Sequence, residues 1–138
     1  MNERIKSIVD IEKYPIHDLN SPIIKKLVKR CKEELDKFSC STIPNFILPK
    51  SLKIMNMELE KQLDEVYMSK ESINAYLYAK DDPSLPPDHP KRTFMNRYNG
   101  YLNSNCFPKD SEMKHLYETE ELLKFVSACL GVSPIYRW

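Results

Sequence analysis

The chain has 138 residues, a length that suits one domain with a sizeable apolar core. Its 21 basic and 20 acidic residues nearly cancel, so the basic excess typical of DNA- and RNA-binding proteins is missing. No apolar run is long enough to cross a membrane and residues 1–15 lack the apolar block of a signal peptide, which predicts a cytoplasmic protein that binds neither nucleic acid nor membrane.

The first clear element is a helix over residues 22–38. Residues 1–20 carry little periodicity and are predicted to be a lead-in to the main part of the domain, 21–138. Ser21 is placed as the N-cap and Pro22 as the first helical residue. The opposite face is rich in Lys and Arg, which is typical of a solvated surface and also of a helix that binds a partner. The buried face is predicted from apolar residues at helical spacing, namely Ile24, Leu27, Val28, Cys31, Leu35 and Phe38.

Residues 40–48 surround a proline and are predicted to be an edge strand or a loop. A second helix is predicted over 50–68, because apolar residues step by three or four along it. The aromatic, partly alternating residues 72–79 predict a strand.

A proline-rich loop, residues 81–90, separates that strand from a second extended segment at 92–102. Each proline fixes its own φ angle and favours extended geometry in the residue before it. The loop is therefore predicted to be stiff, so that little conformational entropy is lost when it is held in place.

The last part of the chain predicts a helix over 111–131 and the start of a strand at 133–138. The helix is expected to break near Tyr117, with Thr119 capping its second piece and Gly131 ending it. The whole pattern predicts an α+β fold, in which about three main helices flank a small, mostly antiparallel and incomplete sheet.

The chain shows no sequence pattern of a metal or nucleophile site. The three histidines, His17, His89 and His115, belong to no metal-binding motif, and two glycines cannot form a phosphate-binding loop. The cysteines lack metal-ligand spacing and are predicted to be reduced thiols. We therefore predict no catalytic residue and no metal ligand in this chain.

The arginines that follow the proline-rich loop are the best candidate binding residues. Arg92 and Arg97 are an odd number of residues apart, so on one strand at most one of them faces inward. An inward arginine beside asparagine and tyrosine is a suitable fork for a carboxylate. The alternative is that both arginines pair with surface acids while Phe94, Tyr98 and Tyr101 pack in the core.

Three segments together resemble a known family. The stretches LPPDHPKRTFMNRYNGYLNS (85–104), LYETEELLKFVSACLG (116–131) and YRW (136–138) resemble the front part of the iron(II)/2-oxoglutarate-dependent oxygenases that include free-amino-acid radical halogenases and related hydroxylases. The likeness runs from about residue 40 to residue 138, and no single motif in it is diagnostic. It implies the front part of a double-stranded β-helix, or cupin-like, enzyme.

The resemblance also implies a role for this chain. In that family the iron-binding histidines and the main cosubstrate arginine follow the point where this sequence ends, so the chain would be an N-terminal segment that is inactive alone. A complete member would use Fe(II) and 2-oxoglutarate on a free amino acid or a similar small polar substrate.

The resemblance assigns residues as well. Arg92 would bind the 2-oxoglutarate or substrate carboxylate, with Arg97 as the second choice, and Asn96 and Tyr98 would add polar contacts. Arg137 and Trp138 would lie at the substrate end of the barrel.

Two alternatives from another class stay open. The chain could be a stand-alone, non-catalytic domain that binds a partner through its basic helix or its aromatic, proline-rich loop. It could also self-associate through the open edge of its C-terminal strand, since an unpaired edge is a template for another strand.

Overall fold

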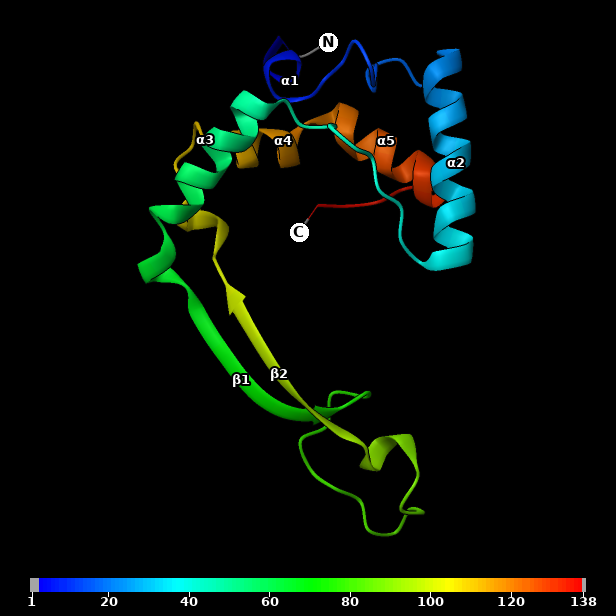
Figure 1. The fold of residues 1–138 in the computed structure, drawn as a ribbon, viewed down its shortest axis with the longest axis vertical. Helices are drawn as coiled ribbons and strands as arrows, with labels where there is room; N and C mark the ends of the chain where they lie inside the picture. The colour runs from blue at the N-terminus through cyan, green and yellow to red at the C-terminus, as the bar shows by residue number, and fades with distance from the viewer. Residues whose placement is uncertain (1–2, 138) are drawn as a thin grey trace. The chain divides into compact units, whose positions relative to one another are not determined.

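The computed structural model describes residues 3–137, in which five α-helices and one two-stranded antiparallel sheet give an α+β fold. The chain divides into two units, shown in Figure 1. The helical unit contains the described residues up to 61 and from 107 onward, and the hairpin unit contains residues 62–106. Within the described residues, no helix combines the length and apolar character needed to span a membrane.

The predicted lead-in belongs to the core of the helical unit. It forms a short helix, α1 (Glu3–Ile8), and Ile5, Val9 and Ile16 are all at most 1% exposed. Residue Tyr14 is also buried, and its hydroxyl donates a 2.7 Å hydrogen bond to the carbonyl of Pro44. These residues show no clear periodicity, yet they are buried, because segments distant in the sequence pack against them.

The helix predicted over 22–38 is confirmed as α2 (Pro22–Phe38). The Ser21 hydroxyl accepts a 3.2 Å hydrogen bond from the N–H of Ile24, and Pro22 stands at the first helical position. Leu27 and Cys31 are buried as the spacing predicts, whereas Phe38 at the C-terminal end is 64% exposed.

The second predicted helix is shorter than its sequence pattern. The segment before it is a loop with one isolated bridge, between Val9 and Ile47. Helix α3 (Pro49–Glu60) then ends at the C-cap Lys61, and a single 3-10 turn, η1 (Leu63–Glu65), leads into a strand. The helical prediction over 50–68 was wrong beyond residue 60: a turn follows the helix, and the residues from Tyr67 onward pair with another strand.

The third predicted helix is two helices, α4 (Glu112–Glu118) and α5 (Glu120–Leu130). The break lies at Thr119, whose extended backbone interrupts the helix while its hydroxyl donates to the Leu116 carbonyl at 2.9 Å. Gly131 ends α5 in the left-handed region, with φ of 69°, as predicted.

Helix α4 begins where a carboxylate of α3 meets its first residues. The Ser111 hydroxyl donates to Glu58 Oε2 at 2.8 Å, and the N–H of Glu112 donates to Glu58 Oε1 at 3.0 Å. Ser111 is completely buried and its oxygen also accepts from the N–H of Lys114. Glu58 therefore joins α3 to α4 and accepts from one of the N–H groups that a helix start leaves free.

One apolar core holds the helical unit together. Helix α2 packs against α5, while α1 contacts both α3 and α4. The rings of Phe46 and Phe125 stack, with centroids 6.1 Å apart. The buried members of this core are Ile5, Ile8, Val9, Tyr14, Ile16, Ile24, Leu27, Cys31, Met55, Phe125 and Cys129.

The C-terminal strand predicted at 133–138 is absent from the part of that segment that the structure describes. Residues 133–137 have no strand hydrogen bonds, and the Arg137 guanidinium instead donates to the Tyr117 carbonyl and pairs with Glu120 at 2.8 Å. The segment is anchored to α4 and α5 through one side chain, so it has no need of a strand partner. Trp138 lies outside the described residues.

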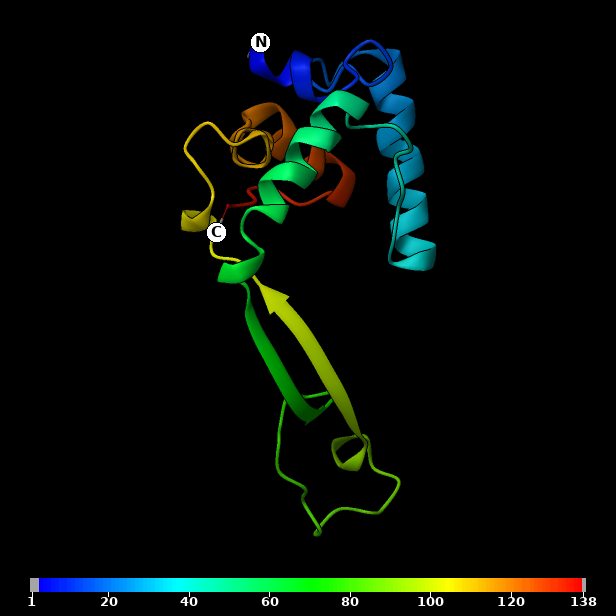
Figure 2. The ribbon, with the colours of Figure 1, turned by 60° about the vertical axis from the view of Figure 1, so that its left-hand side comes forward.

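The sheet consists of β1 (Tyr67–Asn74) and β2 (Phe94–Tyr101). The strands are antiparallel from the pair Tyr67–Tyr101 to the pair Asn74–Phe94, and they run side by side in Figures 1 and 2. The strand expected at 92–102 is confirmed within two residues. The strand expected at 72–79 starts earlier and stops at Asn74, whose side chain turns the chain away.

Candidate functional site

Exposed apolar side chains occur along both strands of the hairpin unit. We call residues 67–101 the hairpin arm, which comprises β1, β2 and the loop that joins them (Figure 2). Large apolar side chains with an exposed fraction of about half or more occur along both strands: Tyr67 (70%), Met68 (50%), Met95 (56%), Tyr98 (67%) and Tyr101 (48%). An isolated two-stranded hairpin is at best marginally stable in water, so these side chains indicate a surface that another element can cover.

The register places apolar residues on both faces of the arm. Residues directly opposite share a face, so Ile73 and Met95 lie on one face with Tyr67 and Tyr101. The other face carries Tyr98 opposite Lys70, Phe94 opposite Asn74, and Met68 opposite Gly100. A Cβ atom at Gly100 would lie only 2.9 Å from Val66 Cγ1, so any other residue there would force the Val66 side chain to shift.

Asn74 ends β1 by gathering the chain around its buried amide. Its Oδ1 accepts hydrogen bonds from the N–H groups of Tyr76 and Tyr78 at 2.9 and 3.0 Å, and its Nδ2 donates to the Lys91 carbonyl at 2.6 Å. Its backbone carbonyl accepts from the N–H of Leu77, which has a φ of 64°. This single side chain, 2% exposed, fixes the corner between the strands and the loop.

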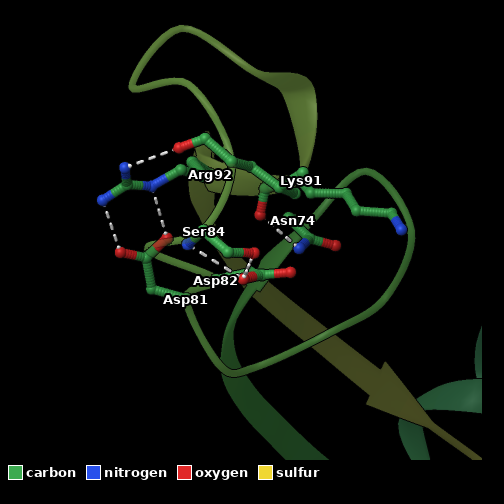
Figure 3. A network of polar contacts seen from close by, with 7 residues as sticks. Asn74, Asp81, Asp82, Ser84, Lys91 and Arg92 are labelled. Carbon is green, nitrogen blue, oxygen red and sulfur yellow. Dashed lines mark hydrogen bonds and ion pairs between the residues drawn. The ribbon is translucent and has the colours of Figure 1, made fainter.

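Arg92 holds the proline-rich loop closed through Asp81. Its Nε and one terminal nitrogen donate to the two Asp81 oxygens at 2.9 and 2.8 Å, and its other terminal nitrogen donates to the Leu85 carbonyl at 3.1 Å. Figure 3 shows the guanidinium facing the carboxylate side-on. The hydrogen bond from Arg92 lowers the pKa of Asp81, and the same bond raises the pKa of Arg92.

Short local turns order the rest of this loop. Asp82 accepts a hydrogen bond from the Ser84 N–H at 3.1 Å, an arrangement visible in Figure 3. His89 Nδ1 accepts from the N–H of Lys91 at 3.1 Å and thereby caps the 3-10 turn η2 (Pro90–Arg92), which starts with a proline. The stiffness expected of the loop thus has a second source in side-chain hydrogen bonds.

The candidate carboxylate-binding residues lie in two different environments. Arg92 precedes β2 and is not on the strand, so the expectation that it shares a strand with Arg97 was wrong. Asn96, Arg97 and Tyr98 are consecutive, exposed residues of β2, with Arg97 opposite Glu71. The structure therefore brings Asn96 and Tyr98 to one face of the ribbon, places Arg97 on the other and leaves Arg92 bonded to Asp81 in the loop.

The other sequence-predicted site residue that the structure describes is Arg137, which belongs to the helical unit and pairs with Glu120.

The cysteines are free, with Cys31 and Cys129 buried and Cys40 exposed. Burial, together with the neighbouring Cys31, raises the pKa of Cys129 to about 12. Over residues 3–137, no three His, Cys, Asp or Glu side chains come together in a group that could hold a metal ion.

No family model, curated protein or solved structure matches this chain.

Sequence reasoning missed Asp81 and Asn74, the two residues that shape the arm. Both precede turns, where Asn and Asp side chains commonly bond to the backbone two residues later. That signal was present in the sequence, but the partners that matter most, Arg92 and the Lys91 carbonyl, become neighbours only when β1 and β2 pair.

Proposed function

We propose that the hairpin arm is a protein-binding element that accepts a partner strand along the free edge of β2. The observation that carries this proposal is the ribbon itself, whose two strands expose apolar side chains on both faces. Strand addition supplies backbone hydrogen bonds for affinity, and the alternating side chains supply specificity. This proposal develops the alternative in which the chain binds a partner through its aromatic, proline-rich segment.

The two edges of the arm are not equivalent. The β1 edge carries Lys70 and Glu71, and at its end the N–H of Asn74 is bonded to the Tyr78 carbonyl. The β2 edge has no proline and a single charged residue, Arg97, along its length. Charged and covered edges resist further strand pairing, so β2 is the better acceptor.

A photo-crosslinking amino acid tests this proposal. We expect the probe at Tyr98 to form products in the native cells, and the probe at Tyr136, which is 84% exposed in the helical unit, to form none of the same products. The substitution Met95→Lys should abolish the Tyr98 products, because it places a charge on the apolar face. Identical products from both probe positions would exclude the arm as the binding element.

A second candidate is the N-terminal segment of an iron(II)/2-oxoglutarate-dependent oxygenase or halogenase-like protein that acts on a free amino acid or a similar small polar substrate. The resemblance of residues 85–104 favours it, since those residues form η2 and β2. In this proposal Arg97, Asn96 and Tyr98 offer exposed polar groups, whereas Arg92 must first leave Asp81. The resemblance also proposes Arg137 and Trp138 as substrate-binding residues, and Arg137 must then leave Glu120.

The described residues include no group of His, Cys, Asp or Glu side chains that could hold iron. This candidate therefore assigns no step to a metal. Its test uses a longer protein that carries these residues. Arg92→Ala and Arg97→Ala should each weaken 2-oxoglutarate binding at least tenfold in calorimetry, and unchanged affinity in both variants would exclude the assignment. A matched Lys70→Ala variant, on the other strand, should bind normally.

A further inference from the structure

We infer that the strand accepted by β2 is the β2 strand of a second copy of this chain, paired about Tyr98. This inference rests on the proposed function of the arm and names its partner. It follows from three properties of β2: which backbone groups are free, which registers a two-fold axis allows, and which side chains each register brings together.

The free backbone groups can be deduced from Asn74. Its N–H donates to the Tyr78 carbonyl and its carbonyl accepts from the Leu77 N–H, so its N–H is not available to Phe94, its partner on β2. Asn74–Phe94 is therefore a pair without mutual hydrogen bonds, and such pairs alternate with bonded ones along an antiparallel ladder. The N–H and carbonyl groups of Phe94, Asn96, Tyr98 and Gly100 thus point away from β1, toward the free edge.

Symmetry then restricts the register. Two copies related by a two-fold axis perpendicular to the ribbon pair antiparallel, and one residue must lie opposite its own copy. The two registers with the greatest overlap of residues 94–101 are centred on Arg97 and on Tyr98. Centring on Arg97 places two like charges directly opposite, which is destabilising. The register centred on Tyr98 places no like charges opposite each other. At its centre it also has a residue whose N–H and carbonyl point toward the free edge, where they can bond to the second copy.

The Tyr98 register aligns side chains of the same kind across four strands. On one face, Ile73 and Met95 continue into Tyr101 and Tyr67 of the second copy, which makes an unbroken apolar row. By symmetry a second such row runs the other way.

The polar side chains of the arm also match in this register. Arg97 lies opposite Asn99 of the second copy. A continuous polar row therefore runs from Glu71 of one copy, through this pair, to Ser69 of the other. On the other face the two Tyr98 rings meet with Lys70 on each outer side, an arrangement suited to cation–π contact. This self-complementarity of both faces selects a second copy over an unrelated strand.

Disulfide trapping tests the register directly. With Cys40→Ser and Cys106→Ser as background, Tyr98→Cys should give a covalent dimer under mild diamide oxidation. Bonded antiparallel residues have Cα atoms about 5.5 Å apart, within the range of about 4.4–6.8 Å that a disulfide spans. Asn96→Cys is the matched control, because in this register the two Asn96 residues are displaced by four positions, roughly 14 Å.

Solution mass gives a second measurement on the unmodified chain. In light scattering after size exclusion, the mass should rise from 16.3 kDa toward twice that value as concentration increases. Tyr98→Lys should remain monomeric, with an unchanged helical circular dichroism signal. A chain that stays monomeric throughout, or an Asn96→Cys dimer as abundant as the Tyr98→Cys dimer, overturns the inference.

The two proposals fail in different ways. If the Tyr98 photo-crosslink captures only a different protein while the chain itself is monomeric, the second-copy inference falls and the binding arm stands. If Tyr98 forms no product beyond those of Tyr136, the binding arm falls as well.

Discussion

Arg92 and Asp81 close the loop of the hairpin arm through two parallel hydrogen bonds between a guanidinium and a carboxylate. The residues are separated by 11 positions, and most of the chain's proline-rich segment lies between them. A paired fork of this kind fixes orientation as well as distance, which lysine cannot do. The pair thus makes the loop one defined structure.

Breaking this pair should loosen the loop without unfolding the helical unit. Arg92→Ala is expected to speed proteolytic cleavage within residues 81–92 several-fold, because the bonds to Asp81 and Leu85 disappear together. The exchanged variant Asp81→Arg/Arg92→Asp should recover part of the protection. Limited proteolysis followed by mass spectrometry measures both, and equal cleavage in the wild type and Arg92→Ala would contradict the role given to the pair.

The same pair predicts a direction of pH dependence. Since Arg92 lowers the pKa of Asp81 below 3.8, the pair is fully formed above the ordinary pKa and is lost as the pH falls through the lower folded value. The Asp81 carboxyl carbon should therefore titrate below pH 3.8 in NMR spectra. In Arg92→Ala the midpoint should return to the ordinary range, whereas an unchanged midpoint would show that Arg92 is not the cause.

Gly100 offers a test of the packing between strands. Gly100→Ala puts a methyl group 2.9 Å from Val66 Cγ1 and 3.2 Å from Met68 Sδ, so the arm should be destabilised by about 1–3 kcal/mol, the usual cost of overpacking. Amide exchange of residues 67–101 should accelerate accordingly. Adding Val66→Ala removes the closer contact and should restore slow exchange; failure of this rescue would place the strain elsewhere.

Glu58 is expected to be the most sensitive carboxylate of the helical unit. Glu58→Ala leaves the buried Ser111 hydroxyl and the Glu112 N–H without their acceptor, at a cost of about 1–3 kcal/mol in unfolding free energy. Glu58→Gln keeps one carbonyl oxygen and should lose less. Urea denaturation provides the measurement, with Glu60→Ala, an exposed neighbour on the same helix, as the control. Equal stability of both alanine variants would contradict the prediction.

The cysteines should differ sharply in reactivity. The thiolate is the reacting form, so the buried Cys129, with its pKa raised to about 12, and the buried Cys31 should resist iodoacetamide at pH 8. Cys40 is exposed and should react first. Peptide mass spectrometry with and without urea distinguishes the two classes, and comparable native labelling of Cys129 and Cys40 would refute this ordering.

Local chemistry determined which elements the sequence could predict. Ser21 and Pro22 start α2, and Gly131 ends α5, through interactions confined to a few neighbouring residues, so these boundaries were predicted correctly. Strand β2 was placed well because its turn signals and aromatic residues stand beside a proline-rich loop.

Elements that depend on distant partners were misplaced. The apolar stripe of α3 continues in the sequence to Val66, but pairing with β2 turns the residues from Tyr67 onward into a strand. The segment at 133–137 has strand-like composition, yet its arginine bonds to α4 and α5 instead. In the candidate site, Arg97 and Tyr98 could be picked from composition, whereas Asp81 and Asn74 could not, because their partners lie across the hairpin.

The interruption of the helical unit by the hairpin unit has a consequence for synthesis on the ribosome. Ile5 and Phe125 share one core, so the first helices leave the exit tunnel long before their packing partner exists. The hairpin arm, in contrast, is local in sequence and can pair while translation continues. The nascent chain thus carries an exposed apolar helix layer until α5 emerges, and the core of the helical unit can close only then.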